Sequence, residues 1–165
     1  MRLLHYINES FNRPYKYKIY DKIPFEYFGY KFQTDDGGDY LVDFNYFSQI
    51  GGNIPFEKIL MKHNLDTKSY EGYIIAFYKV EDDRDNIYLT GSGNAQRVLA
   101  TVLVIIKDFI KREEPQFLTF SAEERSRIKL YDRMIKVLSS KFGYKHIDTI
   151  HNKRSGTGYV LWCGR

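Results

Sequence analysis

Apolar and polar residues alternate along the first part of the chain, which is the spacing of β-strands. Tyr15–Tyr20 alternates aromatic with basic or aliphatic residues, and this pattern predicts an edge strand with lysines exposed along it. Two further alternating runs, Phe28–Thr34 and Tyr40–Phe47, flank the sequence Asp-Asp-Gly-Gly at 35–38. Two such runs around a glycine-bearing turn predict a β-hairpin.

The middle of the chain combines strands with one strongly amphipathic helix. Tyr73–Val80 and Asn86–Thr90 are two further strands around a charged turn. Apolar residues then recur at the i, i+3, i+4, i+7 spacing of a helix between positions 98 and 110. Pro115 ends this helix, and Gln116–Phe120 predicts a short strand after it.

The last part of the chain predicts a second long helix and a terminal hairpin. The helix carries an apolar stripe from Ile128 to Phe142, and Gly143 is suited to the left-handed residue that closes it. Tyr144–Ile150 and Thr157–Trp162 are the strands of the hairpin.

These elements predict an α+β fold with a mixed, mostly antiparallel sheet. A helix that joins two strands of one sheet makes them parallel, so strands 86–90 and 116–120 are expected to form a parallel pair bridged by a crossover helix. The length of 165 residues predicts a single domain, 1–165, with a β-rich N-terminal part over 1–70 and a core over 71–165.

Composition narrows the class of protein. Hydrophobic residues make up 43% and charged residues 28% of the chain, which is ordinary for a globular domain. The aliphatic run Val102–Ile106 is far shorter than the ~20 residues of a membrane span, and Leu3–Leu4 is too short for a signal peptide. The single cysteine, Cys163, and four scattered histidines predict neither a disulfide framework nor a metal site. We therefore expect a cytoplasmic protein without a membrane partner.

Charge is distributed unevenly between the two parts of the chain. Residues 97–165 carry 14 Lys/Arg against 7 Asp/Glu, whereas residues 1–96 carry an excess of acidic residues. A basic region favours phosphate-bearing partners, so a nucleic-acid-binding module is one hypothesis, and the aromatic and basic residues of 15–20 fit it as well. The other interpretation is that the helices carry solvated Lys and Arg on their outer faces.

The segment from Tyr88 to Gln96 contains the clearest candidate for ligand chemistry. A strand ends there, Gly91 and Gly93 free the backbone, and a long helix begins. The free N–H groups and the dipole of a helix N-terminus favour bound anions. The segment has neither the Gly-Lys-Ser/Thr of a Walker loop nor a complete G-x-G-x-x-G pattern.

The order of strand, glycine-bearing turn, long helix, short strand, second helix and final hairpin over about residues 71–163 resembles the GNAT superfamily of N-acyltransferases. More narrowly, TGSGNAQRVLATVLVIIKDFI together with FSAEERSRIKLYDRM is similar to uncharacterised tailed-phage proteins with a GNAT-like core. In the superfamily, the turn pattern Gln/Arg-x-x-Gly-x-Gly/Ala wraps the pyrophosphate of coenzyme A. Here Thr90-x-x-Gly93-x-Ala95 or Tyr88-x-x-Gly91-x-Gly93 takes its place, and both lack the leading Gln or Arg.

The resemblance implies a set of site residues. The groups facing a phosphate of coenzyme A or acetyl-CoA would come from the turn and the first residues of the helix: Gly91, Ser92, Gly93, Asn94, Ala95, Gln96 and Arg97. Tyr131 matches the tyrosine that acts as general acid toward the departing thiolate, although Gly143-Tyr144 follows it later than in the family. The alternative is that Tyr131 is a core residue on the apolar stripe. No general base can be named, because Tyr73–Val80 contains no carboxylate.

Three functions follow as hypotheses. The first is a GNAT-like interaction protein, phage-encoded, which is non-catalytic or weakly catalytic and binds a host or virion protein in the host cytoplasm. The second is an acyl-CoA-dependent N-acyltransferase that acylates an amine. The third is the nucleic-acid-binding module that uses the basic part of the chain.

Overall fold

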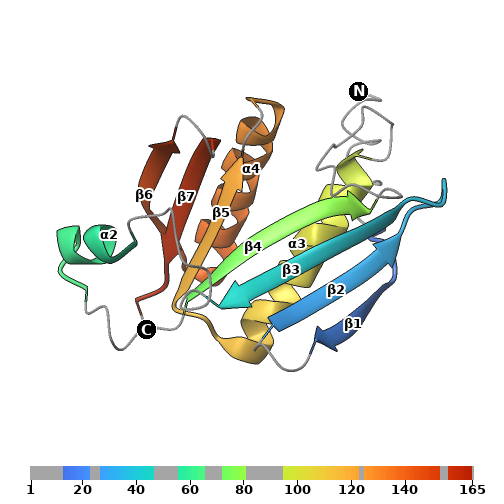
Figure 1. Cartoon of the computed structure of the whole chain (residues 1–165), viewed down its shortest axis with the longest axis horizontal. Helices are drawn as coiled ribbons and strands as arrows, with labels where there is room; N and C mark the ends of the chain where they lie inside the picture. The colour runs from blue at the N-terminus through green and yellow to red at the C-terminus, as the bar shows by residue number, and fades with distance from the viewer. Residues whose placement is uncertain are drawn as a thin grey trace. The chain divides into compact units, whose positions relative to one another are not determined.

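The computed structural model describes most of the chain. The described residues are 13–22, 27–46, 56–65, 72–80, 95–122, 125–152 and 156–164. They form seven strands and three helices (Figure 1). The strands are β1 (Tyr17–Lys22), β2 (Tyr27–Gln33), β3 (Asp39–Tyr46), β4 (Gly72–Val80), β5 (Phe117–Ala122), β6 (Lys145–Asn152) and β7 (Gly156–Trp162). The helices are α2 (Phe56–Lys62), α3 (Ala95–Glu113) and α4 (Arg125–Phe142).

The strands follow the order β1-β2-β3-β4-β5-β7-β6 in one sheet. β1 and β2, β5 and β7, and β6 and β7 are antiparallel pairs, whereas β4 and β5 are parallel. The α+β class, the mixed sheet and the parallel pair bridged by a long helix are therefore confirmed.

The identity of the parallel partner differs from the prediction. Strand 116–120 was expected to pair with Asn86–Thr90, but its parallel neighbour is β4, with Gly72 opposite Phe117 and Ile74 opposite Thr119. The prediction is wrong because β4 and β7 are the two neighbours of β5 in the sheet order, which leaves no edge of β5 for another strand. Residues 86–90 themselves lie outside the described residues.

The chain divides into two compact units. The first comprises residues 1–44 and 76–114, and the second comprises residues 45–75 and 115–165. In the first unit, aromatic side chains of the strands pack against α3. The ring of Phe44 stacks on Phe109 of α3 with centroids 3.8 Å apart, and Tyr30 packs edge-on against Phe44 at 5.6 Å. Burial of such large side chains against one helix face stabilises this unit.

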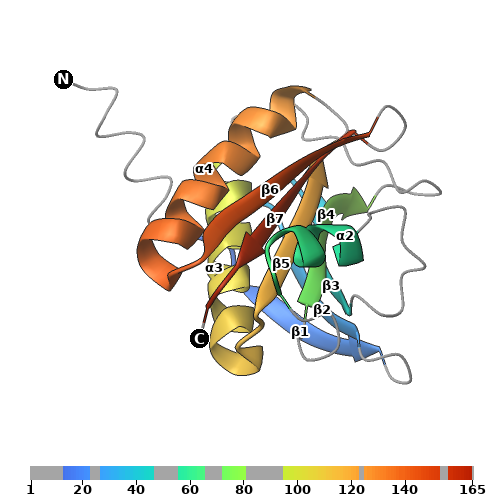
Figure 2. The same ribbon diagram turned by 90° about the vertical axis from the view of Figure 1, so that its left-hand side faces the viewer.

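In the second unit, α2 and α4 cover opposite faces of β5 and β7, as Figure 2 shows. Alternate residues of a strand point to opposite faces. Phe117 of β5 accordingly belongs to a buried cluster with Ile59 and Leu60 of α2, whereas Phe120 packs against Tyr131 of α4.

The structure confirms the predicted hairpin turn at 35–38 and the left-handed residue at Gly143. Gly37 has a φ of 84° in the turn between β2 and β3, and Gly143 has a φ of 73° directly after α4. Residues with a Cβ rarely adopt these positive values. The hairpin turn is held by the N–H of Thr34, which donates to the carbonyl of Gly38 at 2.9 Å.

The predicted edge strand is confirmed, because β1 is the first strand of the sheet order. Lys16 and Lys18 are exposed, whereas the rings of the neighbouring tyrosines contact other aromatic rings of the first unit. Tyr15 stacks on Phe32 at 5.9 Å, and the Tyr17 hydroxyl donates to Asp108 at 3.0 Å. These two rings are therefore engaged in packing, which favours the edge-strand interpretation over base stacking.

No helix in the described part of the chain is long and apolar enough to cross a membrane.

Candidate functional site

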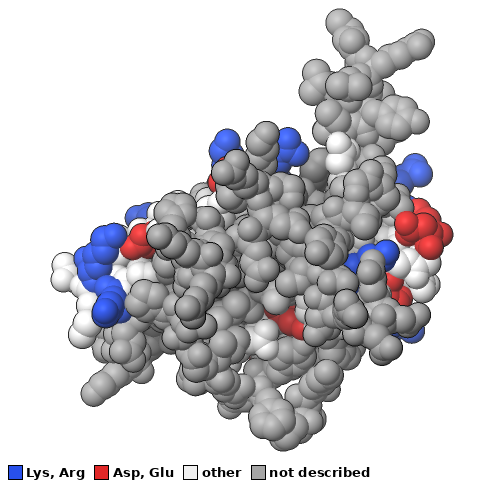
Figure 3. All heavy atoms as spheres, turned by 45° about the horizontal axis from the view of Figure 1, so that its top comes forward, with Lys and Arg blue, Asp and Glu red and all other residues white. Residues whose placement is uncertain are grey.

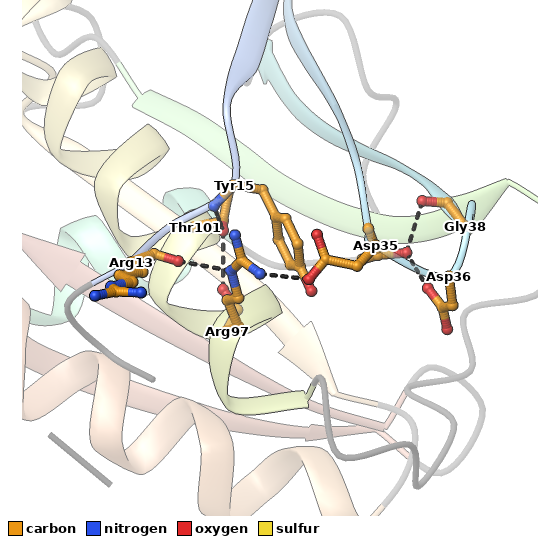
Figure 4. Close-up of polar contacts among 8 residues, drawn as sticks. Arg13, Tyr15, Asp35, Asp36, Gly38, Arg97 and Thr101 are labelled. Atoms are coloured by element: carbon orange, nitrogen blue, oxygen red, sulfur yellow. Dashed lines mark hydrogen bonds and ion pairs between the residues drawn. The ribbon is translucent and has the colours of Figure 1, made fainter. Parts of the chain in front are cut away.

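Arg97, a predicted site residue in the first turn of α3, contacts residues of two other segments of the chain (Figure 4). Its Nε donates to the backbone oxygen of Arg13 at 2.7 Å. Its Nη1 lies 2.5 Å from Oδ2 of Asp35, and its guanidinium carbon lies 3.9 Å from the centre of the Tyr15 ring. The guanidinium is thus held by a carbonyl, a carboxylate and an aromatic face.

The hydroxyl of Thr101 links the backbones of Tyr15 and Arg97 by two hydrogen bonds. The N–H of Tyr15 donates to Oγ1 of Thr101 at 2.9 Å, and the Thr101 hydroxyl donates to the carbonyl of Arg97 at 2.8 Å. Thr101 is fully buried. This chain of bonds ties the segment before β1 to the first two turns of α3, so Tyr15 and Arg97 keep a fixed relation.

The Tyr15 hydroxyl is a buried polar group within this arrangement. The residue is 5% exposed, and its Oη has no partner in hydrogen-bond geometry among the described residues. Burial raises the pKa of Tyr15, and the Asp35 carboxylate raises it further, while Arg97 and the Asp35 backbone amide lower it.

The other residues of the predicted phosphate site are described only in part. Gly91–Asn94 lie outside the described residues. Ala95 is the first residue of α3, and Gln96 after it is exposed. The first turn of α3 contains no acidic residue, which leaves the positive end of its dipole without a local counter-charge from the helix itself.

Tyr131, the predicted general acid, is buried in the second unit. It is 2% exposed, and its ring centre lies 4.8 Å from that of Phe120 and 6.0 Å from that of Tyr159. The side chain therefore belongs to an aromatic cluster formed by α4, β5 and β7. This placement is the one expected for a core residue on the apolar stripe of the helix.

Asp43 and Tyr78 form a polar pair that the sequence did not reveal. Asp43 of β3 is only 4% exposed, and its Oδ2 accepts a hydrogen bond from the Tyr78 hydroxyl of β4 at 2.6 Å. Strand alternation places Asp43 opposite the apolar face of β3, so the sequence predicts solvent exposure. A buried carboxylate held by a phenol is a candidate proton acceptor. The burial of Asp43 is the feature that marks it as a candidate, and strand alternation does not predict this burial.

Two further kinds of site were considered, a metal centre and the thiol of Cys163. No group of three metal-ligating side chains occurs among the described residues. Cys163 is 7% exposed, and its Sγ lies 3.9 Å from the backbone oxygen of Phe142.

Charged side chains are interspersed over the described surface. Figure 3 shows Asp and Glu beside Lys and Arg on the face that it displays. Lys31 pairs with Asp39 at 2.6 Å, and Lys62 pairs with Asp148 at 2.9 Å. The hydrogen bond from Lys62 and the backbone N–H of Thr149 lower the pKa of Asp148.

Comparison with known proteins gives a family and remote likenesses to solved structures, of which two are named here. The structure of FeeM, an N-acyl amino acid synthase from uncultured soil microbes, aligns over 97% of this chain and 85% of its own, at 9% identity and a TM-score of 0.46. A point mutant of the spermidine N-acetyltransferase SpeG from Vibrio cholerae aligns over 98% of this chain and 88% of its own, at 10% identity and a TM-score of 0.43. A search of curated proteins finds no match to the sequence. Residues 27–154 match DUF6934, so the chain belongs to this family of unknown function.

Proposed function

We propose that the chain is a GNAT-like domain that acts as an interaction protein and carries out acyl transfer weakly or not at all. The packing of Tyr131 is the observation that carries this proposal. A general acid has to come within hydrogen-bond reach of the atom it protonates. At 2% exposure, within an aromatic cluster, Tyr131 reaches a thiolate only if the cluster opens.

The contacts of Arg97 support the same proposal. A guanidinium that is to bind a phosphate needs free donors in a fork. Here Nε is used by the Arg13 carbonyl and Nη1 by the Asp35 carboxylate. The positive charge of Arg97 is thus compensated within the unit, which lowers its attraction for a diphosphate.

The kind of partner follows from the resemblance to tailed-phage proteins, which implies a host or virion protein. Binding to such a partner does not require Tyr131 or Arg97 to be accessible. A domain with this fold can therefore bind a partner without carrying out the acyl transfer of the superfamily.

Calorimetric titration with coenzyme A and acetyl-CoA, up to millimolar ligand, tests this proposal. We expect weak heats without saturation below about 1 mM, a limit that corresponds to about 4 kcal/mol of binding free energy. A saturable isotherm in the micromolar range, together with thiol release from acetyl-CoA when amines are added, would overturn it.

An acyl-CoA-dependent N-acyltransferase is the second candidate, and the register of the parallel pair favours it. The pairing of β4 with β5 covers Gly72–Ile74 and Phe117–Thr119, and does not include Ile75 and Phe120, the next residues of the two strands. Backbone groups beyond the paired residues need other partners, and in this alternative a ligand would supply them. In this alternative the Arg97 side chain would hold a phosphate of the cofactor, and coenzyme A would supply the activated acyl group.

The Asp43–Tyr78 pair would contribute a proton acceptor to the second candidate. Tyr78 is only partly buried and donates its hydroxyl proton to a buried carboxylate. An attacking amine has to lose a proton, and a carboxylate that acts through a hydroxyl can take it. Acyl transfer that depends on Asp43 but not on Tyr131 would support this candidate over the first.

A further inference from the structure

Helix α4 carries an excess of positive charge. Six basic residues and one acidic residue occur between Arg125 and Phe142. Four exposed basic residues lie along the second part of α4 and at the start of β6, and we call them the α4 cation patch: Arg133, Lys136, Lys141 and Lys145. Figure 2 shows α4 with one side against the strands of its unit and the opposite side turned away from them.

The charges of the α4 cation patch are not compensated by the described part of the chain. None of its four members forms an ion pair with a carboxylate of a described residue, whereas Lys62 of the same unit pairs with Asp148 at 2.9 Å. Asp132, the acidic residue of α4, acts on the buried Tyr159 of β7, whose pKa is raised by burial and further by this carboxylate. The patch therefore presents a positive field to solvent.

Helix stability accounts for only part of this charge. A cation in the last turn of a helix interacts favourably with the helix dipole, and Lys141 occupies that position. Arg133 and Lys136 lie in the middle of α4, where side chains three positions apart are neighbours, so their like charges repel one another. A bound polyanion would relieve this repulsion.

We propose that the α4 cation patch binds the phosphate backbone of a nucleic acid without reading its sequence. The helical members of the patch, from Arg133 to Lys141, span about 12 Å of the helix axis, and a duplex carries one phosphate for about every 1.7 Å of its own axis. Several phosphates therefore come within reach of the patch at once. This inference goes beyond the proposed function, which concerns a protein partner.

The composition of the patch favours a nucleic acid over an acidic protein. Among the described residues, the exposed large apolar side chains are Ile19, Met61 and Val80, and none of them belongs to the patch. Protein interfaces are built around buried apolar and aromatic side chains, and lysine is depleted from them. Interfaces with nucleic acids are more polar and much more positively charged.

Fluorescence anisotropy with a labelled DNA duplex of mixed sequence tests the proposal. Four phosphate contacts predict that log Kd rises with log salt at a slope of about 3.6, so binding should weaken about a hundredfold between about 50 and 200 mM salt. A duplex of unrelated sequence should bind within about twofold of the first, because phosphate contacts carry no sequence information.

Two double variants locate the binding surface. Arg133→Gln with Lys136→Gln removes two contacts, so the slope should fall to about 1.8 and the weakening over the same salt range to about tenfold. Lys107→Gln with Lys111→Gln is the matched control, because it removes two exposed charges from α3 in the first unit. It changes the net charge equally and should leave the slope of the wild type. Both variants should keep the wild-type Tm, since all four side chains are exposed.

Three results would overturn the proposal. One is a wild-type protein that does not bind the duplex at low salt. Another is an equal loss of slope in the two double variants, which would assign binding to the net charge rather than to the patch. The third is tighter binding to poly-glutamate than to DNA, lost in Arg133→Gln with Lys136→Gln, which would identify an acidic protein as the partner. None of these results bears on the coenzyme A titration, so the proposed function is tested separately.

Discussion

Tyr131 shows how one side chain can satisfy a functional pattern and a structural pattern at once. Its position on the second long helix matches the tyrosine of the superfamily, and it also falls on the apolar stripe of that helix. Helical spacing cannot separate the two uses, because both place the ring on the inner face. The packing against Phe120 and Tyr159 favours the structural use.

Substitution of Tyr131 should therefore affect stability more than chemistry. Tyr131→Ala removes a buried ring and should lower the free energy of unfolding by about 3–5 kcal/mol. Tyr131→Phe keeps the ring and should cost no more than about 1.5 kcal/mol. Urea denaturation followed by circular dichroism gives both values, and a cost below about 1 kcal/mol for Tyr131→Ala would show that the ring is not part of the core.

Tyr17 predicts a pH dependence of stability in alkaline solution. Burial, with a contribution from its hydrogen bond to Asp108, raises the pKa of Tyr17 to about 12. The unfolded chain loses this proton near pH 10, before the folded chain does, so the stabilisation is complete below about pH 10 and is lost between about pH 10 and 12. Solvent screening limits the loss to about 1–2 kcal/mol.

Tyr17→Phe isolates this effect, because it keeps the ring and removes the ionisable hydroxyl. Urea midpoints measured from about pH 8 to about pH 11.5 should fall less steeply for the variant than for the wild type. Parallel curves for the two proteins would contradict the assignment to Tyr17 and point to other tyrosines.

At the scale of elements, regular periodicity predicted most of the fold. The alternation of 28–34 and 40–47 and the stripe of 98–110 correspond to β2, β3 and α3, because one face of each element is buried. The pairing of strands was harder to predict. The sequence predicts two strands before the crossover helix, 73–80 and 86–90, and it does not reveal which of them lies beside β5.

The short helix α2 illustrates how packing completes a weak local signal. Seven residues are too few for a stable isolated helix. Leu60 is 2% exposed in a cluster with Phe117 and Val160, whereas its neighbour Met61 is 69% exposed. Tertiary contact through one face of the helix thus accounts for its formation.

The pair Leu60 and Met61 provides a matched test of this view. Leu60→Ala should lower the free energy of unfolding by about 2–5 kcal/mol, because it leaves a cavity beside β5 and β7. Met61→Ala, a substitution of similar size on the exposed face, should change it by less than about 0.5 kcal/mol. Similar costs for the two variants, measured by urea denaturation, would mean that α2 does not pack in this way.

At the scale of the molecule, the sequence predicted a mixed sheet with one parallel pair bridged by a long helix, and the structure has both, although the parallel strands are β4 and β5. The candidate site was less predictable. Arg97 was identified from its place after the glycine turn, but its partner Asp35 lies 62 positions earlier, and no local pattern connects them. The Asp43–Tyr78 pair likewise joins strands that are 35 residues apart in the sequence. Contacts between distant segments decide which side chains are available, and a single sequence does not report them.

Whether the domain carries out acyl transfer is the central functional question, because a fold does not by itself determine an activity. If Tyr131 and Arg97 have structural roles, the proposed GNAT-like domain has neither an accessible general acid at Tyr131 nor an uncompensated charge at Arg97. In that case, both the binding of coenzyme A and the transfer of an acyl group should be weak or absent.

The rate of thiol release from acetyl-CoA, with a panel of primary amines and polyamines, tests this claim most directly in wild-type protein and Tyr131→Phe. We expect the same rate in both, at the level of the uncatalysed reaction. Protein-dependent release that falls about a hundredfold or more in Tyr131→Phe, within the usual range for a lost general acid, would contradict it.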